Sequence, residues 1–388
     1  MAPRQFLVGV ATTVQAKEKT LKGRKAKRPA LHYCRMAEST AGLGARMIIF
    51  NPDDVNWATG SVSGWKPVSA ARPYGDWERT TERLPDVIYE NVFVHLAVQG
   101  KCRKMRAEAK ERGIPLFNPP LPSKWQSVSF MKSAGLGRYV PDTLLLKDVD
   151  RAVRAIDEWK VTYVKPVGGY GGSGVMRVEA LGGQKYRISV DRSNQGVQKL
   201  RRVVGRSDLQ RILRSRTRVN HLVQKGIPLL NIDGRSVDFR VVTERGVDGE
   251  WHVVGVVPKL AAADGVVTNI VAGGERLSME QLQTLASRHG VTIPTKELTA
   301  CALACSKKLS DRVPRAGLVG FDLGADRNGR VWVIEINPKP ARSLLDDSQK
   351  QQMAKHAAGF AVYLARVRFG RIANTNVRVT AASTHSEM

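Results

Sequence analysis

Short apolar runs alternate with amphipathic stretches along roughly the first 115 residues of the chain. Runs of about four to nine mainly apolar residues are typical of buried strands, whereas apolar positions three or four residues apart are typical of helices. The pattern predicts strands at 5–13, 46–50 and 85–92, a helix at 100–113 that ends at Gly113, and a short strand within 114–120. Alternation of this kind predicts a small α/β domain.

Two stretches of this region do not follow the alternation. Residues 16–31 are basic and polar, and residues 58–75 are rich in glycine, serine and proline. We expect the first to be a loop or an exposed sheet edge, and the second to be a connection.

The rest of the chain also mixes the two periodicities, so a mixed α/β (α+β) fold is expected throughout. Ser123 and Ser207 are predicted helix N-caps, because a serine hydroxyl can accept from the first free backbone N–H groups. Helices are predicted at 123–135, 149–160, 278–290, 295–313 and 346–366, with strands at 162–166, 175–179, 221–227, 236–244 and 250–260.

A glycine-rich loop joins two of these strands in the sequence TYVKPVGGYGGSGVMRVE, residues 162–179. The strand–loop–strand order excludes a P-loop and a dinucleotide-binding turn, both of which open a helix. Glycines let backbone N–H groups approach anionic oxygens, and Lys165 supplies a point charge just before the loop. A phosphate-binding lid is the functional interpretation, and a glycine-rich hairpin without a ligand is the alternative.

The stretch GFDLGADRNGRVWVIEINPKP, residues 320–340, predicts a β-hairpin. With Asn328 and Gly329 as a two-residue loop, Asp322 pairs with Glu335, and Asn337 lies on the same face of its strand. Paired carboxylates repel and need a counterion. Three oxygen ligands on one face suit Mg²⁺ held together with substrate phosphates. An acidic hairpin with solvated carboxylates is the alternative that the spacing leaves open.

Several cations precede this hairpin. Lys124 lies in the first turn of the helix that Ser123 caps, and Arg240 shares a strand face with Asp238. Lys259 ends another predicted strand. Each charge alone fits a surface ion pair, but the convergence of Lys124, Lys165, Arg240 and Lys259 on one acidic ligand would form a site.

Composition narrows the class of protein. The 388 residues carry a formal net charge of +27 and are 42% hydrophobic, enough to form packed cores. No apolar run is long enough to span a membrane, and the N-terminus lacks a signal-peptide pattern. Four scattered cysteines do not make a disulfide framework, so a cytoplasmic protein is expected. The positive charge attracts nucleotides or acidic polypeptides; the absence of a nucleic-acid motif disfavours nucleic acid.

Six ordered motifs resemble the ATP-grasp superfamily, and most closely its YheC/YheD-type branch, described as spore-coat-associated. They are a helix-start lysine (SKW, 123–125), the KPxxGxxGSGV hairpin, a QKGIPL segment at 224–229, VDFR at 237–240, a TNxxxGG segment, and VWVIEINPKP at 331–340. The resemblance implies an ATP-grasp fold with an N-terminal pre-ATP-grasp α/β domain (1–115), a central and lid subdomain (116–226), a C-terminal antiparallel-sheet subdomain (227–345), and a helix with a tail (346–388).

The resemblance also implies ATP and Mg²⁺, or Mn²⁺ in its place, as cofactors, and assigns residues to them. The implied ATP-binding residues are Lys124, Lys165, Gly169, Gly171, Gly172, Ser173, Gly174, Gln224, Lys225, Ile227 and Asp238, with Gln224, Lys225 and Ile227 at the adenine. The implied metal ligands are Asp322, Glu335 and Asn337, and the implied catalytic residues are Arg240, Lys259 and Asn269. Relatives usually have arginine at position 259, and lysine loses bidentate phosphate binding.

The implied activity is an ATP-dependent carboxylate–amine ligase that works through an acyl-phosphate and adds an amino acid to a peptide or protein. The implied partners are an amino acid and an acidic peptide or protein, with no membrane and with a homodimer as an option. The alternative is a non-catalytic spore-coat or scaffold protein that retains the nucleotide-binding fold, which would add spore association to the cytoplasmic location.

Overall fold

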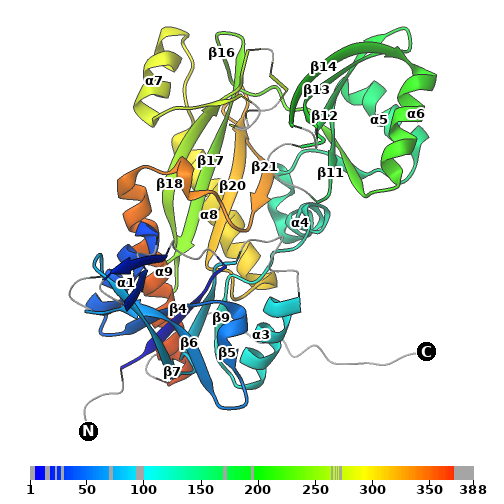
Figure 1. The fold of residues 1–388 in the computed structure, drawn as a ribbon. Helices are drawn as coiled ribbons and strands as arrows, with labels where there is room; N and C mark the ends of the chain where they lie inside the picture. Colours follow the sequence, from blue (N-terminus) through cyan, green and yellow to red (C-terminus); the bar gives the residue numbers. More distant parts are fainter. Residues whose placement is uncertain are drawn as a thin grey trace, which may run out of the picture.

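The computed structural model describes residues 5–13, 18–21, 24–27, 30–69, 73–92, 100–168, 173–193, 196–263, 265–266, 268, 270 and 273–370. Within them the chain builds three sheets, each with helices packed against it (Figure 1). The N-terminal sheet lies at the bottom of the view, the C-terminal sheet stands above it, and the lid sheet lies to the upper right. No described helix has the length and apolarity needed to cross a membrane.

The N-terminal sheet has the strand order β2-β3-β7-β6-β4-β1-β8-β9. Its parallel part confirms the predicted α/β alternation: β1 (Leu7–Ala11), α1 (Leu31–Gly42), β4 (Arg46–Phe50), β8 (Val87–Glu90), α3 (Gly100–Glu111) and β9 (Leu116–Phe117). Residues 7–11 are buried throughout, as expected for a strand with both faces covered.

The prediction that 58–75 forms only a connection is wrong. Residues Ser61–Pro67 form β6, which pairs along its length with β7 (Trp77–Arg83). Gly64 lies against the backbone of Ile49 on β4, where a Cβ would clash, so its glycine serves close strand approach rather than a turn. Residues 18–21 and 24–27 form β2 and β3 at the sheet edge, as the exposed-edge prediction for 16–31 allows.

The lid sheet is antiparallel, with the order β10-β15-β11-β12-β13-β14. The prediction of a Ser207 N-cap is wrong, because α6 begins at Arg206 directly after an extended Gly205 and has no side-chain cap. The sheet and its helices comprise β10 (Thr143–Leu145), α5 (Val149–Trp159), β11 (Val161–Pro166), β12 (Met176–Gly182), β13 (Lys185–Ser193), β14 (Gly196–Gly205), α6 (Arg206–Thr217) and β15 (His221–Lys225).

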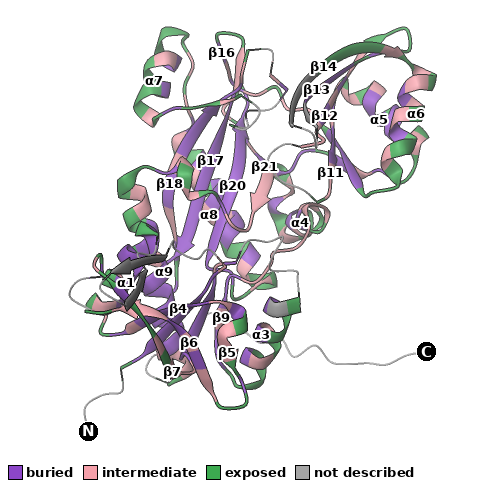
Figure 2. Ribbon diagram, in the orientation of Figure 1, coloured by how far each residue is buried: buried purple, intermediate pink, exposed green. Residues whose placement is uncertain are grey.

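The C-terminal sheet is antiparallel, with the order β19-β18-β17-β20-β21, and its central strands β17 and β20 are buried along almost their whole length (Figure 2). Helix α8 covers one face, where its free cysteines Cys301 and Cys305 are fully buried. The elements are β16 (Asn231–Ile232), β17 (Arg235–Arg245), β18 (Trp251–Leu260), β19 (Glu275–Arg276), α7 (Met279–Arg288), α8 (Thr295–Arg312), β20 (Leu318–Ala325), β21 (Val331–Asn337) and α9 (Asp347–Arg368).

Helix α9 joins the C-terminal part of the chain to the N-terminal domain. Its small residues, such as Ala354, Ala357 and Ala361, pack in the same core as Tyr33 of α1 and Tyr89 of β8. The helix predicted at 346–366 is therefore present, and it completes the N-terminal core. Residues 371–388 of the predicted tail lie outside the described residues.

Asn118 also connects the two parts. It has a left-handed backbone with φ of 62°, and its Oδ1 accepts from the N–H groups of Gly317 (2.6 Å) and Leu318 (2.9 Å) at the start of β20.

We predict that Asn118→Ala lowers the free energy of unfolding by about 2–5 kcal/mol, because two buried N–H groups lose their acceptor. Thermal and urea denaturation measure this.

Asn56→Ala is the matched control. Asn56 Oδ1 likewise accepts from two backbone N–H groups, of Ala58 and Thr59, but all three lie at the surface, where water replaces the lost acceptor. We expect its cost to be about 1 kcal/mol or less. Equal losses in the two variants would contradict the structural role given to Asn118.

Candidate functional site

A cleft opens between the lid sheet and the C-terminal sheet. Its volume is about 960 Å³, counted to its open mouth. Strands β11 and β15 form one wall, and strands β17, β18, β20 and β21 form the other. The lining residues are Pro141, Tyr163, Lys165, Val175, Gln224, Lys225, Ile227, Leu229, Ser236, Asp238, Lys259, Ala261, Val266, Thr268, Asp322, Ile334 and Glu335.

Most of the predicted site residues that the structure describes meet in this cleft. Arg240 and Asn337 do not line it but lie directly beside it, because both hydrogen bond to Asp322. The predicted residues in the lining itself are Lys165, Gln224, Lys225, Ile227, Asp238, Lys259, Asp322 and Glu335.

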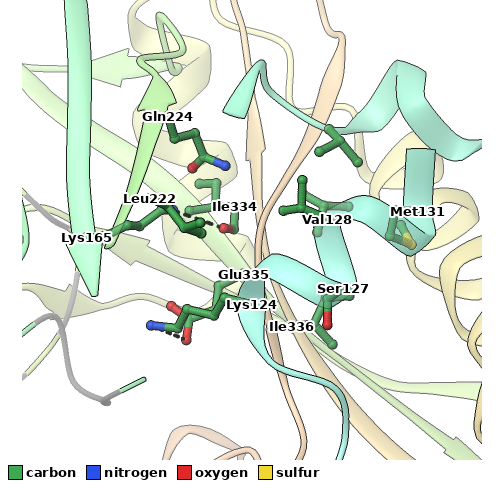
Figure 3. A pocket seen from close by; sticks show the side chains of 12 residues that line it. Lys124, Ser127, Val128, Met131, Lys165, Leu222, Gln224, Ile334, Glu335 and Ile336 are labelled. Carbon is green, nitrogen blue, oxygen red and sulfur yellow. Dashed lines mark hydrogen bonds and ion pairs between the residues drawn. The ribbon is translucent and has the colours of Figure 1, made fainter. Parts of the chain in front are cut away.

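A smaller pocket of about 420 Å³ adjoins the cleft and shares four lining residues with it, namely Lys165, Gln224, Ile334 and Glu335. Lys124 enters this pocket from the first turn of α4 (Lys124–Met131). Figure 3 shows its ammonium beside the Glu335 carboxylate, and the two atoms lie 3.4 Å apart. The predicted N-cap at Ser123 is present as a capping box with Gln126, and it fixes the helix start that aims Lys124.

The hairpin pairs Asp322 with Glu335, as predicted, but by a different route. The predicted two-residue loop is wrong: the Asp326 N–H bonds to the Arg330 carbonyl, so residues 327–329 form a three-residue loop inside that bond, with Gly329 at a φ of 75°. A β-bulge then shifts the register between Asp322 and Leu323. The pairs on either side identify Ile334 as the extra residue of β21, so the two one-residue deviations cancel.

Asp322 receives four hydrogen bonds. Arg240 donates through Nε (2.9 Å) and Nη2 (3.0 Å), Lys259 donates from 2.9 Å, and Asn337 Nδ2 donates from 3.1 Å. A carboxylate offers about four acceptor positions, so this one is saturated. Burial would raise the pKa of Asp322, but Lys259 and Arg240 hold it well below its usual range. The counterion that the paired carboxylates need is therefore supplied, in this structure, by the protein.

Lys259 is a bridge between two acids. Its ammonium lies 3.0 Å from Asp238 and 2.9 Å from Asp322, and the residue is 4% exposed. Asp238 also accepts from the Thr268 hydroxyl. Of the four cations expected to converge on a ligand, Arg240 and Lys259 are thus paired with Asp322, whereas Lys124 and Lys165 line the smaller pocket.

Lys165 projects from β11 into both pockets. Its ammonium donates to the Ile334 carbonyl over 3.3 Å, so the bulge residue of the hairpin positions it. Burial lowers the pKa of Lys165 to about 8; the Glu335 carboxylate opposes this shift, and the Lys124 ammonium adds to it. The group is therefore a buried cation near its point of deprotonation, and an anionic ligand would stabilise its charged form.

The predicted hinge lies where β15 leaves the lid sheet. Gln224 is paired with Thr143 on one side and Tyr163 on the other, and its amide donates to the Thr143 hydroxyl over 3.0 Å. Lys225 is 3.9 Å from Asp142, and Ile227 follows as the chain turns away from the strand.

Part of the predicted lid loop and one predicted catalytic residue lie outside the described residues. They are Gly169, Gly171, Gly172 and Asn269. Ser173 and Gly174 form the turn that enters β12, with Gly174 at a φ of 74°.

The sequence did not single out several lining residues. Ser236 and Tyr163 were within reach of sequence reasoning, because each lies two positions before a predicted site residue on the same strand face. Val175, Leu229, Val266 and Thr268 carry no comparable signal, since they reach the cleft only through sheet packing.

The donor chemistry of the hairpin fits Mg²⁺ in part. Glu335 faces the pockets and, among the described residues, is paired with Lys124 alone. Asn337 uses Nδ2 for Asp322, which leaves its Oδ1 oxygen for another ligand. Mg²⁺ needs one or two carboxylates when substrate phosphates complete its shell. Asp322 could join only by exchanging a present partner. Over the described ranges, no three His, Cys, Asp or Glu side chains gather as a metal cluster.

The chain matches a known protein family and two named relatives. A model of the family described as YheC/D like ATP-grasp matches residues 113–364. Endospore coat-associated protein YheD of Bacillus subtilis (strain 168) is 26% identical over 331 residues, which cover 81% of this chain and 69% of that protein. Endospore coat-associated protein YheC of the same organism is 23% identical over 331 residues, covering 82% of this chain and 88% of that protein.

Solved structures were also matched. The ATP-grasp ligase PsnB, complexed with a phosphomimetic variant of its minimal precursor, Mg and ADP, is 15% identical with a TM-score of 0.49, covering 92% of this chain and 99% of that one. The D-cycloserine synthetase DcsG is 12% identical with a TM-score of 0.49, covering 93% and 99%. Because the family model matches well over half of the 388 residues, this chain belongs to the YheC/D-like ATP-grasp family and has its α+β fold.

Proposed function

We propose that this protein is an ATP-dependent carboxylate–amine ligase that forms a peptide-type bond through an acyl-phosphate. The supporting observation is that Lys124, Lys165, Gln224 and Glu335 meet in adjoining pockets between two antiparallel sheets. Family membership supports ATP as the nucleotide. The substrates we propose are an amino acid and a peptide or protein, and the net charge of +27 favours an acidic polypeptide.

The two lysines are proposed to hold the phosphates. Phosphoryl transfer depends mainly on positioning and on neutralising charge, so it requires no acid–base pair. Lys165 is buried and rigidly placed, and Lys124 is fixed by the capped start of α4. Glu335 and Asn337 would hold Mg²⁺, or Mn²⁺, which supplies further neutralisation of phosphate charge when bound.

Arg240 and Lys259 are proposed to act first through Asp322. They fix its carboxylate between β17, β18 and β20, and this sets the position of β21 with its ligands. Direct contact of Arg240 or Lys259 with a phosphate requires exchange of their present partner. These contacts, the adenine contacts of Lys225 and Ile227, and the role of Asn269 stay predictions.

A second candidate function is a non-catalytic coat or scaffold protein. The names of the two Bacillus relatives favour it, since both are called endospore coat-associated. The same names add spore association to the proposed cytoplasmic location. Turnover separates this candidate from the ligase.

We predict that Glu335→Ala lowers ADP release by at least about a hundredfold, because the phosphates lose the carboxylate that would hold their metal ion. ADP release is measured with MgATP and a panel of amino acids and acidic peptides. A scaffold protein would show no substrate-dependent ADP release at all, and its nucleotide binding would change little in the variant.

Glu275→Ala is the control for this experiment. Glu275 is an exposed carboxylate on β19 of the same sheet, paired with Arg235 at 3.3 Å. We expect its turnover to equal that of the wild type. No ADP release from the wild type across the whole panel would remove the ligase proposal.

We predict that ATP affinity falls as the pH rises from about 7 to 9. The ammonium form of Lys165 binds phosphate, and its lowered pKa of about 8 means that this form is lost across that interval. The loss approaches about tenfold per pH unit above the pKa, less whatever the bound phosphate restores. Isothermal titration with a non-hydrolysable ATP analogue measures it.

Lys165→Arg tests the assignment of this effect. Arginine stays charged at pH 9, so the variant should bind the analogue with a flatter pH dependence, whatever its absolute affinity. An unchanged pH dependence in Lys165→Arg would show that another group titrates.

A further inference from the structure

The junction of α6 and β15, residues 216–221, holds the glycine-rich loop where that loop leaves the lid sheet. Pro166 ends β11 and pairs with His221 of β15. The next residue, Val167, donates its N–H to the Asn220 carbonyl over 2.8 Å. The departing end of the loop is therefore attached to the junction through its backbone.

The returning end of the loop is attached to the same junction by a side chain. Gly174 has a φ of 74°, and its carbonyl accepts from Arg216 Nη1 over 3.2 Å. A Cβ on Gly174 would lie 3.7 Å from the Pro166 ring, so the two ends lie side by side. Lys165 precedes one end, Val175 follows the other, and both line the cleft. Arg216 thus acts on a turn that carries part of the cleft wall.

Arg216 occupies a position of α6 that faces the lid sheet. Leu209 and Leu213 of this helix are fully buried in the lid core. Residues at i, i+4 and i+7 share one face of a helix, and Arg216 is the third member of this series, where the pattern favours an apolar side chain. The residue is half-buried rather than exposed. The helix therefore directs the guanidinium toward Gly174 and not toward solvent.

The guanidinium of Arg216 has no acidic partner. It forms no ion pair with any described carboxylate, whereas Arg206 of the same helix pairs with Asp157 at 3.3 Å and Arg211 pairs with Asp208 at 2.5 Å. A cation that is partly removed from water is costly when no acid pairs with it. A purely stabilising role therefore explains this arginine less well than a role in placing the turn that it contacts.

His221 orients this guanidinium. Its Nδ1 lies 2.7 Å from the Val219 carbonyl, which can only accept, so Nδ1 carries the hydrogen. In the uncharged ring Nε2 is then an acceptor, and it lies 3.4 Å from Arg216 Nη1. The imidazole is itself buried. Arg216 is thus held between the imidazole ring and the Gly174 carbonyl.

We propose that Arg216 is a positioning residue for phosphate binding. It holds Gly174 beside Pro166 and so fixes where the loop enters β12. Lys165 and Val175 occupy the next positions after Val164 and Met176, the last listed pair of the β11–β12 ladder, so they depend on this contact for their alignment.

This inference rests on the proposed function, because it assumes that phosphates bind at Lys165 and at the loop that follows it. Arg216 itself contacts the protein and no proposed ligand, so its effect on a nucleotide is indirect. Small errors in the position of binding groups are enough to cause large losses of binding or rate.

Nucleotide binding to the full-length protein tests the proposal. Arg216→Met removes the donors but keeps an apolar stem at a sheet-facing position, so the variant should fold. It should bind a non-hydrolysable MgATP analogue about tenfold or more weakly, and AMP within about twofold of the wild type, because AMP lacks the β- and γ-phosphates. Isothermal titration measures both. Wild-type affinity for the analogue would overturn the proposal, as would equal losses for the analogue and AMP, which indicate a disturbed lid sheet.

Arg214→Met is the matched control. Arg214 lies two residues earlier in α6, is exposed, and its side chain forms no hydrogen bond with a described residue. This variant should bind the analogue like the wild type. Arg216→Lys keeps a donor for the Gly174 carbonyl and should recover most of the affinity lost in Arg216→Met. A lysine variant as weak as the methionine variant would contradict the assignment to this contact.

The outcomes separate this inference from the proposed function. Analogue binding that does not depend on Arg216 removes the positioning role and leaves the ligase proposal in place. Analogue binding that depends on Arg216, without ADP release for any substrate in the panel, supports the positioning role and removes the ligase proposal. A wild-type protein that binds no analogue overturns both.

Discussion

The buried Asp322 carboxylate is the interaction on which the rest of the site depends. It accepts hydrogen bonds from side chains on three other strands of its sheet, β17, β18 and β21, while it belongs to β20 itself. A buried charge is tolerable only when its partners saturate it, and removing one partner leaves the remaining charges uncompensated. This one group therefore fixes the relative positions of Arg240, Lys259 and Asn337, and through the hairpin that of Glu335.

This arrangement divides the cations of the site into two kinds. Arg240 and Lys259 are used to neutralise buried acids, so they are structural charges in the ligand-free protein. Lys124 and Lys165 line the smaller pocket, where the partly exposed Glu335 is the one acid among the described lining residues. The pocket between Lys124, Lys165 and Glu335 thus has the charge that a metal-bound phosphate chain would complement.

The N-terminal domain is not an independent appendage. Helix α9, from the far end of the chain, completes its core, and Asn118 ties its last strand to the start of β20. The join between the two parts is therefore made by the packing of α9 in the N-terminal core and by the hydrogen bonds of Asn118.

The sequence by itself determined the features that depend on local spacing. The strand–loop–strand order around Lys165, the capped start of α4 and the same-face placement of Asp322, Glu335 and Asn337 follow from periodicities of 2 and 3.6 residues. The motif order was enough to identify the family. Two of the wrong predictions were the connection at 58–75 and the two-residue hairpin loop. In the first, Gly64 of β6 packs against Ile49, which is distant in the sequence, and in the second a β-bulge at Ile334 changes the register.

Only the tertiary structure decided which charges neutralise one another. Lys259 and Arg240 reach Asp322 across 63 and 82 residues, and Lys165 reaches the Ile334 carbonyl across 169. No local pattern encodes such pairs, because sheet order and register set them after the chain has folded.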